Sequence, residues 1–100
     1  MLDLTLITGF HWDAGNARKN DKHDVSNAEA EQVFFNVPLL VAPDAGHSGK
    51  ESRLHALGVT DDGRHIQISF TVRDEGRKVR VISARPMNRK ERTIYEQQGA

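Results

Sequence analysis

Seven side chains have the types that phosphodiester cleavage requires: one lysine, one histidine, one carboxylate and four arginines. They are Lys22, His23, Glu51, Arg53, Arg73, Arg80 and Arg85. A ribonuclease without a metal needs a base for the 2′-hydroxyl, an acid for the leaving 5′-oxygen, and cations that stabilise the pentacovalent transition state. Histidine or glutamate can transfer the protons, and arginine can bind phosphate through two hydrogen bonds. The alternative is that His23 only ends a helix, while Glu51 and Arg53 only decorate an exposed strand.

Other kinds of site have less support. The chain has five histidines, but no pair has the helical i, i+4 ligand spacing with a carboxylate or cysteine nearby. We therefore expect no metal and no cofactor. No glycine-rich phosphate loop follows a strand, and no serine has the glycine neighbours of a hydrolase nucleophile. The absence of cysteine excludes thiol catalysis and is typical of a reducing compartment. With no apolar run of ~18 residues and no signal peptide, we expect a soluble cytoplasmic protein that has no membrane contact.

Three β-branched stretches in the second half of the chain predict the strands that position these side chains. Residues 65–73 and 78–85 alternate between apolar and polar types, and residues 54–59 precede them as a third strand. The predicted sheet is antiparallel, with one apolar face for packing. Its open face carries Arg53, His55, Gln67, Ser69, Thr71, Arg73 and Arg80.

The two turns fix the register of this sheet. A two-residue loop at 75–76 places Val81 opposite Phe70 and Arg80 opposite Thr71.

In the preceding hairpin, a three-residue turn with Gly63 at its bulge places His55 beside Ser69. A two-residue loop there would bury two cationic side chains, so we prefer the bulged turn. Strict alternation puts Arg85 on the packing face, and only its place at the end of the strand lets it reach the open face.

The N-terminal part of the chain predicts a strand over 4–10 and then a short, weak helix that begins at Asp13 and ends near residues 22–24. Packing of Trp12 onto Ala17 should hold this helix, and Asp24 should take the left-handed conformation.

A stronger helix should begin at Ser26 and stop at Pro38. Ser26 and Glu29 have the spacing of a capping box, and a buried face is predicted for Ala30, Val33, Phe34 and Val37.

An edge strand at 39–42 and a polar loop at 44–50 should follow this helix. The final helix should be capped by Asn88 with Glu91. Arg89 and Arg92 lie in its first turns, where cations oppose the helix dipole, so an anionic partner is indicated.

A chain of 100 residues forms one domain, 1–100, with a single core. Its net charge is zero, but the charge is polarised. Residues 1–52 contain four Lys/Arg and eight Asp/Glu, while residues 53–100 contain ten and six. The basic half includes the open sheet face.

Between Phe10 and Tyr95, several short motifs follow one another in a characteristic order. They are F-x-W-D at 10–13, K-H at 22–23, E-x-R at 51–53, V-I-S-A-R at 81–85 and E-R-x-x-Y at 91–95. In these motifs the chain resembles the BrnT family, the toxin halves of bacterial type II toxin–antitoxin pairs. The resemblance implies an α+β, RelE-like fold: an antiparallel β-sheet with N-terminal helices packed on one face and a C-terminal helix. Asn16 and Asp24 stand where the family usually has Lys and Gly.

Two hypotheses follow. In the first, the chain is a metal-independent endoribonuclease toxin that inhibits translation. Its catalytic residues are His23, Lys22, Glu51, Arg53 and Arg85, and its RNA-binding residues are Arg73, Arg80, His55, Arg89 and Arg92. In the second, the chain is a non-catalytic or weakened toxin homologue that binds its antitoxin and acts as co-repressor of its operon.

The resemblance also implies partners. They are a BrnA-type antitoxin, an RNA substrate, and operator DNA bound indirectly through the antitoxin. We expect the antitoxin to shield the basic face and to use the edge at 39–42.

Overall fold

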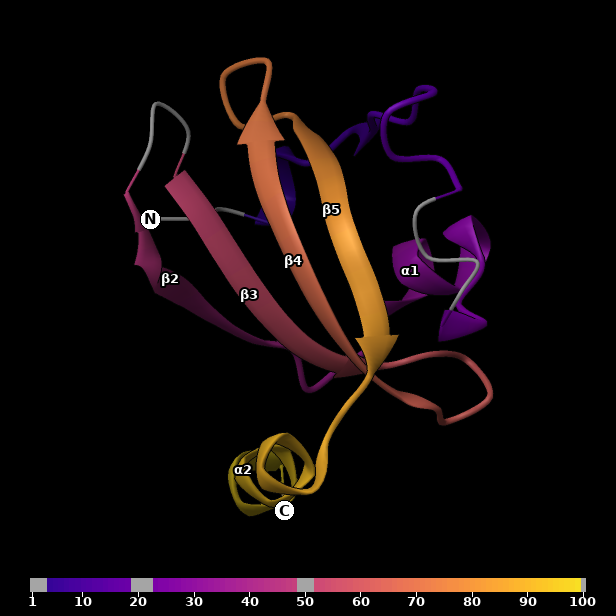
Figure 1. Cartoon of the computed structure of the whole chain (residues 1–100), viewed down its shortest axis with the longest axis vertical. Coiled ribbons are helices and arrows are strands. Elements are labelled where there is room, and N and C mark those ends of the chain that lie inside the picture. The colour runs from indigo at the N-terminus through magenta and orange to yellow at the C-terminus, as the bar shows by residue number, and fades with distance from the viewer. Residues whose placement is uncertain (1–3, 19–22, 49–51, 100) are drawn as a thin grey trace.

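The computed structural model of the chain describes residues 4–18, 23–48 and 52–99. Its elements in order are a 3₁₀ turn η1 (Leu4–Leu6), β1 (Gly9–Phe10), α1 (Asn27–Val33), β2 (Leu40–Ser48), β3 (Ser52–Val59), β4 (His65–Arg73), β5 (Lys78–Pro86) and α2 (Arg89–Gly99). The strands form one five-stranded sheet in the order β1-β5-β4-β3-β2. Figure 1 shows α1 beside the β5 side of the sheet and α2 below the ends of the long strands.

The α+β class is confirmed, and the sheet is mixed. Strands β2 to β5 pair antiparallel, as predicted, but β1 pairs with β5 in parallel through Gly9↔Lys78 and Phe10↔Val79. Among the described residues, no helix is long and apolar enough to cross a membrane.

Both predicted registers are confirmed. Strand β4 pairs with β5 through Phe70↔Val81 and Thr71↔Arg80. Positive φ angles at Asp74, Glu75 and Gly76 allow the tight turn that closes this hairpin.

The bulged turn between β3 and β4 also forms as predicted. Gly63 has φ 83° and donates its backbone N–H to Thr60, and His55 pairs with Ser69.

Arg85 is on the open face, where it was expected to reach, but the packing-face position that strict alternation gives it is wrong, because β5 contains a β-bulge that the alternation did not show. Phe70 pairs with Val81, whereas Ser69 pairs with Ser83, so one extra residue lies between these positions. A bulge reverses which face the following side chains occupy. Ala84 therefore enters the core opposite Ile68, and Arg85 lies opposite Gln67 on the open face.

The core lies between α1 and the apolar face of β3, β4 and β5. It contains the buried side chains of Ala30 and Val33 from α1 and those of Ile66, Ile68 and Phe70 from β4. The rings of Phe34 and Phe70 meet edge to face with their centroids 5.0 Å apart. Because this packing covers one side of the sheet, the polar side chains of β3 and β4 point to the other side.

The N-terminal predictions fail in part. The expected strand over 4–10 is a 3₁₀ turn followed by only two strand residues, and residues 14–18 form turns in place of a helix. The low helix propensity of a segment with Gly15 and Asn16 explains this outcome. Trp12 donates its Nε1–H to Glu31 of α1 at 2.7 Å, so Trp12 bonds to α1 as well as packing against the core. Asp24 takes the left-handed conformation, φ 56°, as predicted.

Helix α1, which was predicted to begin at Ser26 and stop at Pro38, is shorter than predicted. The Ser26–Glu29 capping box is present, but α1 ends at Val33, and Val37 is 87% exposed. Beyond it, β2 is an edge strand as expected. It continues to Ser48, through part of the segment predicted to be a loop.

Candidate active site

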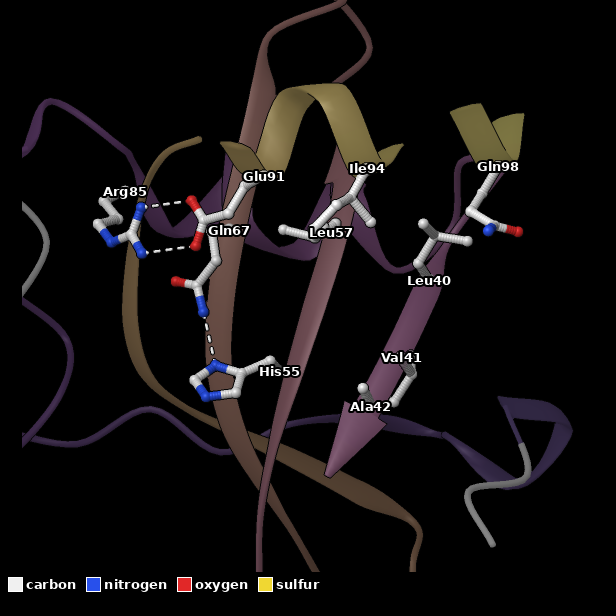
Figure 2. A pocket seen from close by; sticks show the side chains of 10 residues that line it. All are labelled: Leu40, Val41, Ala42, His55, Leu57, Gln67, Arg85, Glu91, Ile94 and Gln98. Carbon is white, nitrogen blue, oxygen red and sulfur yellow. Dashed lines mark hydrogen bonds and ion pairs between the residues drawn. The ribbon is translucent and has the colours of Figure 1, made fainter. Parts of the chain in front are cut away.

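A pocket of about 680 Å³ opens between α2 and the open face of the sheet. Strands β2 to β5 and one side of α2 supply its walls (Figure 2). The apolar lining residues are Leu40, Val41, Ala42, Leu57 and Ile94, and the polar ones are His55, Gln67, Arg85, Glu91 and Gln98. The pocket therefore joins an aliphatic wall to a small set of polar and charged groups, which is the usual constitution of a binding site.

His55 is held by two polar neighbours from β4. Its Nδ1 lies 2.6 Å from Gln67 Nε2 and 3.1 Å from Ser69 Oγ. Strand pairing brings these side chains together, since His55 is opposite Ser69 and Gln67 is two residues away on the same face. An amide nitrogen can only donate, so in this arrangement Gln67 donates to Nδ1 and the proton of the neutral ring lies on Nε2, while the Ser69 hydroxyl can also donate to Nδ1. Figure 2 shows Nε2 on the side of the ring that faces away from Gln67.

Arg85 and Glu91 form the charged side of the pocket. Two parallel bonds of 2.8 Å join Nη1 and Nη2 of Arg85 to Oε1 and Oε2 of Glu91 (Figure 2). Burial alone would raise the pKa of Glu91, but the bonds from Arg85 and from the Asn88 backbone outweigh burial and hold that pKa below its usual value. The same pairing raises the pKa of Arg85. Both groups are therefore charged at neutral pH.

The pocket depends on the position of α2, which is fixed by contacts at two successive turns of the helix. Asn88 caps the helix by accepting from the Glu91 backbone at 2.8 Å, as predicted. At the next turn, the buried Tyr95 donates its hydroxyl to the Pro38 carbonyl at 2.6 Å and packs edge to face on His65. Burial raises the pKa of Tyr95. Among the described residues, the Arg85–Glu91 pair and Tyr95 thus help to anchor the helix.

A second polar cluster lies where the segment after β1 meets β5. Arg80 binds Asp13 through contacts of 2.9 and 3.1 Å and approaches His11 Nδ1 at 3.0 Å. The bond from Arg80 is the main reason that the pKa of Asp13 is lowered. Asn16 is 2% exposed and donates to the carbonyls of His11 and Val81. Asn16 is thus a structural link between the segment after β1 and β5, and Arg80 already has a carboxylate partner.

The predicted site residues do not all meet at the pocket. Arg85 and His55 line it, and Arg53 lies on the same strand as His55 and two residues away. Arg73 lies at the far end of β4, beside a smaller pocket that includes His11 and Lys78.

Other predicted residues lie elsewhere. His23 precedes α1, and the backbone carbonyl of its neighbour Asp24 accepts from the guanidinium of Arg64 at the β3–β4 turn. Arg89 and Arg92 are exposed on α2. Lys22 and Glu51 lie outside the described residues.

Sequence reasoning missed the role of Glu91 and the apolar wall. The N-cap pattern identified Glu91 only as part of a capping box, because its pairing with Arg85 depends on the bulge in β5. Leu57 and Ile94 are apolar residues for which the sequence predicted no core contact. That mismatch is the signal that could have indicated an apolar wall outside the core. Among the residues described, no group of three or more His, Asp or Glu side chains could hold a metal ion.

Comparison with known proteins agrees with the motif order. A search of curated proteins found no match to the chain. A family model described as "Ribonuclease toxin, BrnT, of type II toxin-antitoxin system" matches residues 12–91, which is most of the chain. The resemblance inferred from the motifs is therefore confirmed, and the chain belongs to the BrnT family of ribonuclease toxins from type II toxin–antitoxin systems.

Proposed function

We propose that the chain cleaves RNA without a metal ion and that the open face of the sheet binds the substrate. The observation that carries this proposal is the position of His55, whose Nδ1 is held by Gln67 and Ser69 while its ring lines a pocket that also contains Arg85. A histidine fixed at one nitrogen is oriented to exchange a proton at the other.

The reaction needs one proton removed and one proton supplied. If the Gln67 amide turns over so that its oxygen, in place of Nε2, faces His55, Nδ1–H can donate to that oxygen or to Ser69, and the Nε2 lone pair of His55 can then accept the proton of a ribose 2′-hydroxyl. The 2′-oxygen then attacks phosphorus, and the bond to the 5′-oxygen breaks with transfer of a proton to that leaving group. His23, Lys22 and Glu51 remain predicted partners for the second proton transfer.

Cations on the same face would bind the phosphate. Arg53 and Arg73 belong to the open face by their positions in β3 and β4, and Arg85 reaches it because of the bulge. An arginine stabilises the extra negative charge of a phosphorane through directed N–H donors. In this proposal the guanidinium of Arg85 is held in place by Glu91 before the substrate binds.

A specific observation favours the second candidate function, a non-catalytic toxin homologue. Arg80 and Arg85, two of the predicted cationic side chains, are already bound to Asp13 and Glu91. Engagement with a carboxylate reduces the charge that each can offer to RNA. A chain with this arrangement could still bind a BrnA-type antitoxin and contribute to operator binding through it.

RNA cleavage in the presence of a chelator separates the two candidates. Purified wild-type chain, with EDTA present, is incubated with a labelled RNA, beside Arg53→Ala and the control Arg77→Ala, which removes an exposed turn cation. We expect cleavage by the wild type and the control, and a rate lower by about tenfold or more for Arg53→Ala. Absence of cleavage by the wild type, together with antitoxin-dependent binding to operator DNA, would support the second candidate instead.

A further inference from the structure

Gln67 is a buried side chain of the pocket that lies between His55 and the Arg85–Glu91 pair. It is only 4% exposed, and strand pairing places it opposite Leu57 on β3 and opposite Arg85 on β5. Its amide nitrogen lies 2.6 Å from Nδ1 of His55. Figure 2 shows that nitrogen directed to the ring and the amide oxygen directed away from it, toward the side of the pocket where Arg85 lies.

The two ends of the Gln67 amide differ in what they can do. The nitrogen only donates hydrogen bonds and the oxygen only accepts them, whereas each nitrogen of a neutral imidazole does one or the other. With the amide nitrogen at Nδ1, the proton of the neutral His55 ring lies on Nε2. With the amide oxygen there, the proton lies on Nδ1 and Nε2 presents a lone pair. Ser69 does not decide between these states, because its hydroxyl, 3.1 Å from Nδ1, can donate or accept.

The charged side chains around His55 favour the first of these states. Among the described residues they are Arg53 on β3, Arg85 on β5 and Glu91 on α2. The guanidinium of Arg85 can only donate, so it favours the oxygen of the amide on its side and leaves the nitrogen for the ring. Glu91 accepts two bonds of 2.8 Å from Arg85, which hold that guanidinium in place.

We propose that Gln67 is a positioning residue for RNA cleavage, because the orientation of its amide decides which nitrogen of His55 carries the proton. In the chain without RNA the amide nitrogen faces the ring, the ring proton lies on Nε2, and no second proton can be accepted there. When the amide turns over, Nε2 can take the proton of the ribose 2′-hydroxyl, and the ring then carries a proton on each nitrogen, with Nδ1–H donating to the amide oxygen.

The part of Gln67 in catalysis rests on the proton transfer by His55 proposed above. The tautomer of the ring can be measured without any reaction. The alternative is that the buried amide only stabilises the fold, in which case its replacement would change the melting temperature and leave the tautomer as it is.

Two substitutions at Gln67 and one control separate these roles. Gln67→Glu replaces the amide by a carboxylate, which only accepts and should therefore hold the proton on Nδ1, as the carboxylate of a catalytic triad does. Gln67→Met keeps an unbranched side chain of similar length and removes both ends of the amide. Gln97→Glu makes the first change at an exposed residue of α2 that is not part of the pocket lining. Thermal melts establish that each variant is folded.

The tautomer of His55 is measured by NMR in the free chain, at a pH where the ring is neutral. Correlation of the ring C–H protons with the two ring nitrogens distinguishes the protonated nitrogen from the other one. The spectrum of His55→Gln identifies the signals of this residue among those of the five histidines. We expect Nε2–H in the wild type and in Gln97→Glu, Nδ1–H in Gln67→Glu, and both forms in Gln67→Met.

The pH profile of RNA cleavage, with EDTA present, is the second readout. In Gln67→Glu the bend in log kcat/KM should move to higher pH than in the wild type, because the added carboxylate stabilises the charged form of the ring. In Gln67→Met kcat should fall by about 10–100-fold, since the ring loses the partner that orients it. Gln97→Glu should change neither quantity.

Three results would overturn the proposal. The first is Nδ1–H in the wild-type chain without RNA. The second is the same tautomer in the wild type and in Gln67→Glu, which would leave Gln67 a structural role only. The third, decisive if Gln67→Glu does not fold, is an unchanged tautomer in Gln67→Met. Tautomers that change as expected in a chain that does not cleave RNA would refute the proposed nuclease activity and leave the control of His55 by Gln67 supported.

Discussion

The Arg85–Glu91 pair should be a measurable anchor of α2, and replacing Glu91 by Gln tests it. The substitution keeps the size of the side chain and keeps a residue type that completes a capping box with Asn88. It removes the negative charge that accepts two bonds of 2.8 Å from Arg85. The change therefore isolates the charged part of the anchor from its helix-capping part.

The expected loss can be worked out from the exposure of the two groups. A hydrogen-bonded charge pair that is shielded from water contributes about 1.5–3 kcal/mol. The Glu91 side chain is 21% exposed, but that of Arg85 is 36% exposed, so water screens the interaction. We expect Glu91→Gln to lower the free energy of unfolding by roughly 1 kcal/mol, which for a chain of this length is a decrease in Tm of about 4–8 °C.

The pH dependence has a fixed sign. The pKa of Glu91 is lowered in the folded chain from its usual value of 4.5. A group with a lowered folded-state pKa stabilises the fold fully above its unfolded-state pKa, and the contribution is lost as the pH falls through the folded-state value. The difference between wild type and Glu91→Gln should therefore be constant near neutral pH and shrink progressively below pH 4.5.

Urea denaturation at neutral pH and at several lower pH values gives the necessary free energies. The control is Glu96→Gln on the same helix, because Glu96 and Arg92 are 3.7 Å apart and both more than half exposed. That exposed i, i+4 pair should contribute less than about 0.5 kcal/mol. Equal losses in the two variants, or a loss in Glu91→Gln that persists unchanged in acid, would refute the reasoning.

Three further substitutions should change stability in ways that thermal or urea unfolding can check. Asn16→Ala removes a buried amide that bonds to two carbonyls and accepts from the Asp13 backbone, and it should cost about 2–4 kcal/mol; a loss under 1 kcal/mol would contradict its structural role. Gly58→Ala should cost about 1–3 kcal/mol, because the added Cβ would lie 2.7 Å from Cγ1 of Val33, and an unchanged Tm would contradict this close approach. Asp24→Gly should stabilise the chain by up to about 1 kcal/mol, since φ is 56° at this position, and destabilisation would show that the Asp side chain has a further role.

The β3–β4–β5 meander could be predicted from the sequence because its signals are local. Alternation assigned the strands, and the turn residues Gly63 and Gly76 fixed the registers that the structure contains. The two capping boxes, at Ser26 and Asn88, were equally local. The hydrogen bonds of a capping box join residues that are three positions apart, so they can be predicted without the rest of the fold.

The features that could not be predicted depend on contacts distant in sequence. The bulge in β5 reversed the face of Arg85, and nothing in the types of residues 81–85 distinguishes a bulged strand from a regular one. The early end of α1 at Val33 and the turn after Trp12 reflect tertiary contacts, including the bond from Trp12 to Glu31.

The position of α2 was likewise not predictable, because its anchors join segments far apart in the chain. The longest such contact, from Tyr95 to the carbonyl of Pro38, spans 57 residues. The pocket, which needs both α2 and the bulge, could therefore emerge only from the structure.

The dependence of the RNA cleavage rate on pH, with EDTA present, tests the central claim most directly. If His55 transfers a proton, log kcat/KM of the wild-type chain should bend at the pH where this ring changes its protonation state. His55→Gln should abolish the bend and lower the rate by about 10²–10⁴, while His23→Gln should retain the bend. A profile unchanged by His55→Gln would contradict the account. A bend abolished by His23→Gln alone would assign the proton transfer to His23, in the segment that precedes α1.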